Sequence, residues 1–177
     1  MNFLKLSGKT ILIFGVANRK SVGFAAAEVL GEQGARGVYV VRSEERKHTL
    51  EKLLKDPHIH LCDVERPQEI QALAHTVKEK YPVIHGIVHS IAFANYSEGK
   101  RPFHETNRQD FLQSMQISCH SLIEIANTFR DQLDENASGG TEGSHRGCHV
   151  DCAAHCPPRP GRPVCASASR RLAEHQT

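Results

Sequence analysis

Short apolar runs alternate with amphipathic stretches over the first 137 residues. The apolar runs have the length of buried strands and cover residues 10–16, 37–41, 58–62 and 83–92. The stretches between them repeat apolar residues every three or four positions and cover residues 21–33, 43–54, a helix beginning at Pro67, and 107–133. A helix after every strand predicts an α/β fold with a doubly wound, Rossmann-like parallel sheet.

The same periodicity predicts which side of each helix is buried. In the first helix the predicted face is Val22, Ala25, Ala26, Val29 and Leu30. In the third helix it is Ile70, Leu73, Ala74 and Val77. In the long last helix it is Phe111, Met115, Leu122, Ala126, Phe129 and Leu133.

A glycine turn joins the first strand to the first helix. Gly15 lies at the end of the apolar run, and Ser21 stands where the helix begins. A glycine there allows a sharp turn and a close approach of a pyrophosphate, which the N–H groups at the helix start would bind. Ser21 could cap the helix or donate to a phosphate. Because the turn lies between the first strand and helix of a β-α-β unit, it predicts nucleotide binding.

Four segments carry a family resemblance. They are Gly15-Val-Ala-Asn-Arg-Lys-Ser-Val22, Cys62-Asp-Val64, His85-Gly-Ile-Val-His-Ser-Ile-Ala-Phe-Ala94, and the Phe111-Leu, Ile117-Ser and Ser121-Leu pairs. In these segments the chain resembles the enoyl-[acyl-carrier-protein] reductases, a divergent branch of the short-chain dehydrogenase/reductase superfamily. The resemblance implies reduction of a trans-2-enoyl thioester on acyl carrier protein with NADH or NADPH. It also implies fatty-acid biosynthesis in the cytoplasm and a dimeric or tetrameric enzyme.

The resemblance also implies roles for residues on the first and third strands. Gly15, Ser21 and Val22 match the pyrophosphate-binding turn of the family. Asp63 and Val64 match a pair that contacts the adenine. The alternative for Asp63 is a cap of the local turn or helix.

After the fourth strand the resemblance implies contacts to the other end of the cofactor. Ser90, Ile91 and Ala92 match the stretch along the nicotinamide ribose, and Ala94 matches a residue at the mouth of the acyl-substrate site. For the neighbouring His89, as for Cys62, a buried strand residue is the favoured interpretation over a metal or redox site.

Arg42 ends the second strand, where an acidic residue would bind the ribose 2′-hydroxyl of NADH. An arginine suits the 2′-phosphate of NADPH instead. The sequence therefore favours NADPH.

The catalytic pair of the family is missing from its expected place. The family uses a tyrosine and a lysine on the helix after strand five, and strand five is expected just after Ala137. No tyrosine follows Tyr96. The pattern Tyr96-x-x-x-Lys100 is rejected as that site because it contains Gly99 and lies in the loop after the fourth strand. The sequence thus predicts an inactive chain with no catalytic residue. The alternatives are a non-catalytic nucleotide-binding remnant or a short-chain reductase acting on a carbonyl.

The composition changes abruptly after residue 137. Residues 138–177 hold four of the six cysteines and contain no Ile, Met, Phe, Tyr or Lys. Such a segment cannot bury enough apolar surface to fold. We expect an incomplete nucleotide-binding domain over 1–137 and a disordered tail, translated out of frame, over 138–177; the other two reading frames of the encoding DNA test this.

Two further expectations concern the same boundary. Cys148, Cys152 and Cys156 could also be interpreted as zinc ligands. A structural zinc site usually combines two such ligand pairs, and here the sequence has no second pair and no predicted strand to hold the site. Without a fifth strand, residues 85–92 would form an exposed apolar sheet edge, which favours aggregation.

Charge and hydropathy exclude other classes of protein. The 22 basic and 20 acidic residues give a net charge of +2, which predicts no nucleic-acid partner. No run approaches the roughly 18 apolar residues that cross a membrane, so no membrane partner is expected.

Overall fold

The computed structural model describes residues 5–55, 57–95, 99, 102–135 and 137. These residues form a parallel sheet, as the alternation of strands and helices predicted, with four strands in the order β3-β2-β1-β4. The strands are β1 (Thr10–Phe14), β2 (Arg36–Val41), β3 (His58–Leu61) and β4 (Gly86–His89). β1 lies in the middle, and its residue Ile11 is in register with Gly37 of β2 and Gly86 of β4.

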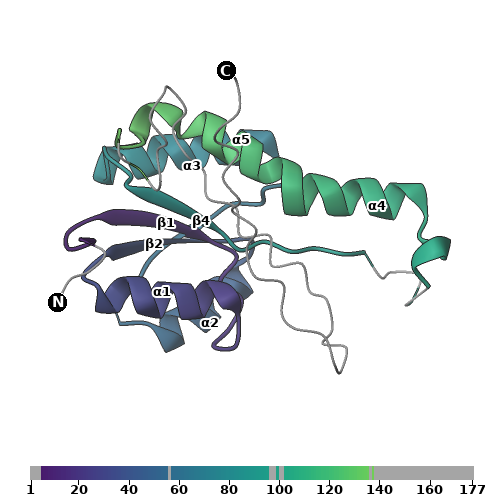
Figure 1. Ribbon diagram of the computed structural model, residues 1–177, viewed down its shortest axis with the longest axis horizontal. Helices are drawn as coiled ribbons and strands as arrows, with labels where there is room; N and C mark the ends of the chain where they lie inside the picture. Colours follow the sequence, from purple (N-terminus) through teal and green to yellow (C-terminus); the bar gives the residue numbers. More distant parts are fainter. Residues whose placement is uncertain (1–4, 56, 96–98, 100–101, 136, 138–177) are drawn as a thin grey trace, which may run out of the picture.

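Helices cover both faces of the sheet (Figure 1). One face carries α1 (Val22–Glu32) and α2 (Glu44–Leu53), and the other carries α3 (Pro67–Lys80) and α5 (Ser121–Thr128). Before α5 come η1 (Phe103–Glu105), α4 (Arg108–Met115) and the π-helical turn η2 (Gln116–His120), and after it comes η3 (Arg130–Gln132). The fold is doubly wound.

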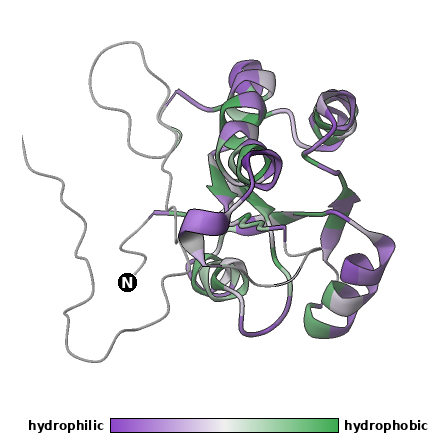
Figure 2. Cartoon of the chain, turned by 90° about the vertical axis from the view of Figure 1, so that its right-hand side faces the viewer, coloured by the Kyte–Doolittle hydropathy of each residue, from purple (hydrophilic) through white to green (hydrophobic). Residues whose placement is uncertain are grey.

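The core divides at the sheet because strand side chains alternate between its faces. Leu12 and Phe14 of β1 pack toward α3 and α5, whereas Ile11 and Ile13 pack toward α1 and α2. Figure 2 shows the strands largely in hydrophobic colour and much of the outer helical surface in hydrophilic colour. The predicted face of α3 is buried in full: Ile70, Leu73, Ala74 and Val77.

The predicted buried face of α1 is wrong at three of its five residues, Val22, Ala25 and Val29; Ala26 and Leu30 are half-buried. Gly23, Phe24 and Ala27 are buried, whereas Val22 is 59% exposed and Val29 is 53% exposed. The reason lies in packing: the helix approaches β4 through Gly23, where an added Cβ would lie 3.2 Å from the Cβ of Ser90. That close approach turns the bulky Phe24 into the core and leaves the valines outside.

The long helix predicted over 107–133 is not a continuous α-helix. The π-helical turn η2 separates α4 from α5, and the 3-10 turn η3 follows. A π turn widens the helix and shifts the face that follows. Leu122 and Phe129 are buried as predicted, and Ile117 and Ile125 join them in the core. The predicted core residues Phe111 and Met115, which precede the π turn, are exposed.

The fourth strand is shorter than predicted. The segment that pairs beside it begins earlier in the chain than the predicted fifth strand. β4 covers Gly86–His89 rather than 83–92. Ile84 forms a parallel bridge with Leu133, in which the Ile84 N–H donates to Gln132 O and the Asp134 N–H donates to Ile84 O. The strand-like position beside β4 is therefore reached at Leu133, before the predicted start after Ala137.

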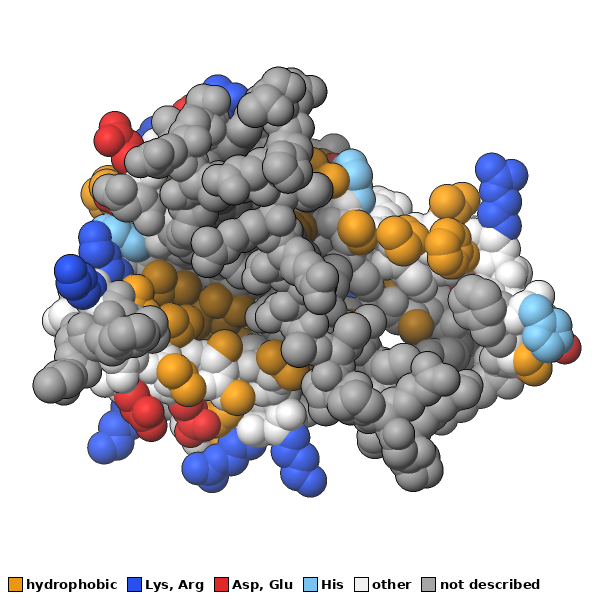
Figure 3. All heavy atoms as spheres, viewed as in Figure 1, with side chains coloured by type: hydrophobic (Ala, Val, Ile, Leu, Met, Phe, Trp, Pro, Cys, Tyr) orange, Lys and Arg blue, Asp and Glu red, His pale blue; other side chains and the backbone are white. Residues whose placement is uncertain are grey.

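Exposed apolar side chains lie along α4, which extends beyond the sheet (Figures 1 and 3). They include Phe111, Leu112 and Met115. Among the described residues, no helix combines the length and hydropathy needed to cross a membrane. The predicted tail over 138–177 lies outside the described residues, as do Tyr96 and Lys100.

Candidate functional site

The turn after β1 is packed against the end of β4. Gly15 has φ +83°, a conformation that glycine adopts most easily, and an added Cβ would lie 2.1 Å from Ser90 O. Ser90 is itself fixed because its N–H donates to Phe14 O over 3.1 Å. Gly15 and Gly23 thus allow the first turn, the start of α1 and the residue after β4 to meet.

Ser21 acts as the N-cap of α1. Its Oγ accepts from the Phe24 N–H at 3.3 Å and donates to Asn18 O at 2.7 Å. Of its two predicted uses, the structure displays the cap. Val22 follows as the first helical residue, on the exposed side.

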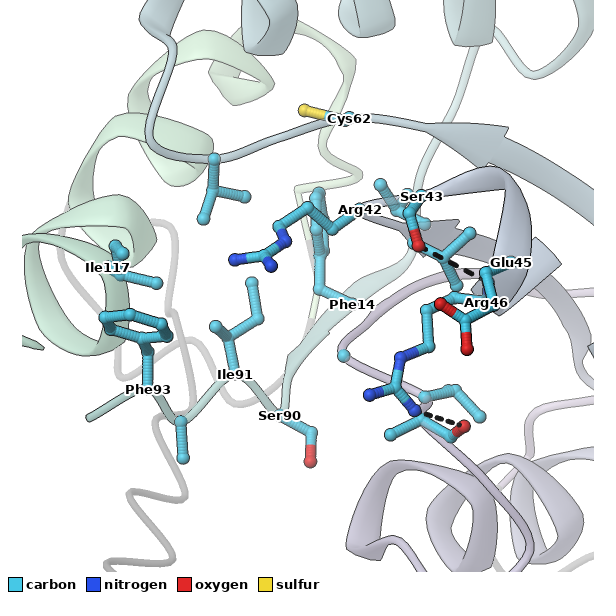
Figure 4. Close-up of a pocket in the computed structure, with 17 residues that line it drawn as sticks. Phe14, Arg42, Ser43, Glu45, Arg46, Cys62, Ser90, Ile91, Phe93 and Ile117 are labelled. Carbon is cyan, nitrogen blue, oxygen red and sulfur yellow. Dashed lines mark hydrogen bonds between the residues drawn. The ribbon is translucent and has the colours of Figure 1, made fainter. Parts of the chain in front are cut away.

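A cavity of about 350 Å³ opens where the strands end (Figure 4). Its walls are the glycine turn, the corner between β2 and α2, the residues after β3, the loop after β4, and one residue of η2. In that order the lining residues include Gly15, Arg42, Ser43, Glu45, Arg46, Cys62, Val64, Ser90, Ile91, Ala92, Phe93 and Ile117.

Six of the ten predicted site residues line this cavity: Gly15, Arg42, Val64, Ser90, Ile91 and Ala92. The other four, Ser21, Val22, Asp63 and Ala94, are not among its lining residues. The roles of all ten residues stay predictions.

Two arginines reach the cavity from the corner between β2 and α2. Figure 4 shows Arg42 extending into the cavity from the end of β2. Arg46 lies in the first turn of α2, where Ser43 is the N-cap, and its Nη1 donates to Ala17 O at 3.2 Å. Sequence reasoning missed Arg46; the cap at Ser43 was the signal that places position 46 in the first helical turn.

The residues after β3 form a tightly bonded turn. Asp63 Oδ1 accepts from the Glu65 N–H at 3.2 Å, and the Asp63 N–H donates to Glu69 Oε2 at 2.7 Å. That N–H, together with the guanidinium of Arg66, lowers the pKa of the Glu69 carboxyl. Asp63 therefore serves the local turn, which was the alternative interpretation of this residue.

Cys62 is a buried wall residue, as predicted. Burial, and to a lesser extent the carboxylates of Glu69 and Asp63, raise the pKa of its thiol to about 12. The thiolate is the nucleophilic form of cysteine, so this residue contributes shape rather than reactivity.

The loop after β4 is held by the helices above it. Ser118 of η2 binds the backbone of Phe93 twice: its Oγ accepts from the N–H at 2.8 Å and donates to the carbonyl at 3.2 Å. Ser121 lies 2.8 Å, Oγ to Nε2, from the ring of His89. His89 is buried, as predicted, and burial lowers its pKa.

Comparison with known proteins identifies the family of the chain. The sequence model of a family described as Enoyl-(Acyl carrier protein) reductase matches residues 15–147. The chain is 35% identical over 140 residues to the Enoyl-[acyl-carrier-protein] reductase [NADPH] FabI of Staphylococcus aureus, which covers 76% of this chain and 55% of that relative. It is 36% identical over 143 residues to the Enoyl-[acyl-carrier-protein] reductase [NADH] FabI of Bacillus subtilis, and this match covers 78% of this chain and 55% of that relative.

Solved structures give the same result. The Bacillus cereus enoyl-acyl carrier protein reductase, solved with NADP+ and indole naphthyridinone, has a TM-score of 0.68 and 31% identity, covering 73% of this chain and 52% of that one. FabI from Candidatus Liberibacter asiaticus also has a TM-score of 0.68, with 33% identity, and the match covers 72% of this chain and 51% of that one. The chain spans about half the length of the relatives it matches. Over most of its own length, it belongs to the enoyl-[acyl-carrier-protein] reductase family.

Proposed function

We propose that the cavity binds a nicotinamide dinucleotide, and that the chain is the cofactor-binding part of a reductase for trans-2-enoyl thioesters on acyl carrier protein. One observation carries the proposal: the glycine turn, the corner after β2 and the loop after β4 meet around one cavity at the carboxyl ends of the strands. Doubly wound sheets bind dinucleotides at this position.

The residues present fit such a cofactor. Gly15 keeps the turn free of a side chain, and the first-turn N–H groups of α1 favour a pyrophosphate behind it. Val64 on one side and Ile91 on the other give the cavity apolar walls. In this assignment Asp63 and Val64 lie toward the adenine, and Ser90 to Ala92 lie along the nicotinamide ribose.

The corner after β2 favours NADPH. Arg42 and Arg46 bring two guanidinium groups to the cavity, and guanidinium binds phosphate through paired hydrogen bonds. Arg46 would exchange its bond with Ala17 O for the 2′-phosphate. Glu45 also lines the cavity and is the residue that would favour the ribose hydroxyl of NADH.

A fluorescence titration of the full chain with NADPH and NADH tests this part of the proposal. NADPH is expected to bind at least about tenfold more tightly, and Arg42→Ala to remove most of that difference. Glu45→Gln on the same corner is the comparison variant: it removes the group that would favour NADH, so the preference for NADPH is expected to be retained or increased. Tighter binding of NADH would refute the assignment.

The bound nicotinamide would supply the hydride, and the residues of this chain would orient it. Ile91, Phe93 and Ile117 keep water from that end of the cavity, and Ala94 lies exposed just beyond them, at the proposed acyl entrance. Negative charge grows on the thioester oxygen during reduction and needs a hydrogen-bond donor. In the part of the chain that the structure describes, Tyr39 and Tyr81 lie away from the cavity lining.

We therefore propose that the chain as given binds the cofactor without turning over. NADPH oxidation with a crotonyl thioester is the assay, and binding without oxidation is the expected result. Measurable oxidation would overturn the proposed inactivity. Oxidation with a ketoacyl thioester alone would favour a carbonyl reductase instead.

A further inference from the structure

Three polar side chains form a bridge beside the cavity. Gln113 of α4 donates from Nε2 to Glu65 Oε1 at 2.9 Å. Its Oε1 accepts from Asn95 Nδ2 at 3.2 Å. All three residues are half-buried. One amide group thus joins the turn after β3 to the loop after β4.

The chemistry of the bridge requires an amide at position 113. A carboxylate only accepts hydrogen bonds, so the NH2 group of Gln113 must face Glu65 and its oxygen must face Asn95. A leucine would lose both bonds, and a glutamate would place two carboxylates side by side. The bond to Glu65 involves a charged group and is the stronger of the two.

The two joined loops are opposite walls of the cavity. Glu65 directly follows the lining residue Val64, and Asn95 comes two residues after the lining residue Phe93. β3 and β4 stand at the two ends of the strand order, with β2 and β1 between them. Backbone pairing within the sheet therefore does not join these loops to each other directly.

One loop is closed by its own hydrogen bonds and the other is held by η2, so the distance between the two loops is what remains to be set. The turn after β3 is closed by the bonds of Asp63 to Glu65 and Glu69. The loop after β4 is held by Ser118 on the backbone of Phe93. Gln113 connects these two preformed units.

We propose that Gln113 is a positioning residue that sets the width of the cavity for a ligand touching both walls. This inference rests on the proposed function, in which the adenine lies at the wall after β3 and the nicotinamide ribose at the wall after β4. A dinucleotide spans both walls and benefits from a preset width. A ligand confined to the β2 and β3 side does not.

Two ligands separate this role from a merely structural one. In the full chain, Gln113→Leu is expected to raise the Kd of NADPH about tenfold, the scale of one lost charge-assisted hydrogen bond. The Kd of 2′,5′-ADP, which lacks the nicotinamide half, is expected to stay within about twofold. Gln109→Leu, an exposed glutamine on the same helix, is the matched control and is expected to change neither value.

A side-chain swap keeps the proposal falsifiable if the leucine variant folds poorly. Gln113→Glu alone places two carboxylates together and is expected to weaken NADPH binding. Combining it with Glu65→Gln lets the new amide donate to the new carboxylate, whose second oxygen accepts from Asn95. The double variant is therefore expected to recover NADPH binding.

The outcomes distinguish this inference from the proposed function. Wild-type NADPH affinity in Gln113→Leu, an equal loss of both ligands, or no recovery in the double variant would each overturn the positioning role. A wild-type chain that binds neither NADPH nor 2′,5′-ADP would overturn the proposed function and, with it, this inference.

Discussion

Replacing Gly15 by alanine tests the contact on which the site is built. The residue has φ +83°, where a side chain costs about 1–2 kcal/mol. The new Cβ would lie 2.1 Å from Ser90 O and 2.5 Å from Ser90 C, both backbone atoms. Since Ser90 is tied to Phe14 O, the clash cannot be relieved by a side-chain rotation, and overpacking of this kind costs about 1–3 kcal/mol. Together the two costs lower the free energy of unfolding by about 2–5 kcal/mol.

Gly8 provides the matched control. It has φ +73°, and an added Cβ would meet nothing within 4 Å. Gly8→Ala therefore shares the backbone strain and the unfolded-state entropy change, but not the clash. Thermal unfolding followed by circular dichroism should place the Tm of Gly15→Ala about 2–12 °C below that of Gly8→Ala. Equal Tm values for the two variants would refute the packing of Gly15 on Ser90.

Three other predictions follow from side chains around the cavity. Ser118→Ala should lower the free energy of unfolding in urea by about 1–3 kcal/mol, because two backbone groups of Phe93 lose their partner. Ser114→Ala, which loses only a bond to Asp110 O of its own helix, is the control, and an equal effect would argue against the clamp. At pH 8, iodoacetamide should modify the exposed Cys119 and spare Cys62, whose pKa is raised to about 12; peptide mapping that finds equal rates in the folded chain would contradict this. Burial lowers the pKa of His89 from its usual value of 6.5. As the pH is lowered, the unfolded state therefore binds a proton at this residue before the folded state does, and the free energy of unfolding decreases. His89→Gln should flatten that fall between pH 7.5 and 5.5, leaving the part that His60 contributes in the same direction; an unchanged slope would assign the effect elsewhere.

The predictable parts of the fold are those governed by local patterns. The parallel sheet with helices on both faces follows from alternating strands and helices, and the buried face of α3 follows from four apolar residues after Pro67. The π turn was not predictable, because apolar residues spaced by three or four fit an unbroken helix equally well. Its presence depends on packing, since it brings Ile117 and Ser118 to the loop after β4.

The same division holds for the site. Gly15 and Arg42 were found from their places at the ends of predicted strands, whereas Ser90 was found through the family resemblance. All three follow strands of the sheet, and strand ends meet at one edge of a parallel sheet. Gln113 could not be predicted as a site residue from the sequence. Helical periodicity identifies apolar residues on a buried face, and Gln113 is a polar residue on a helix whose neighbouring residues are exposed. Its importance appears only when the distance between two loops is known.

The central position of β1 has a consequence for the order of events during synthesis. Thr10 pairs with Arg36 and Ile11 with Gly86, so the two partners of β1 leave the ribosome 50 residues apart. At rates of about 5–20 residues per second, that interval lasts about 3–10 s. During it, one side of the most buried strand has no neighbour. The nascent chain is therefore most vulnerable to chaperone capture or mispairing before β4 emerges.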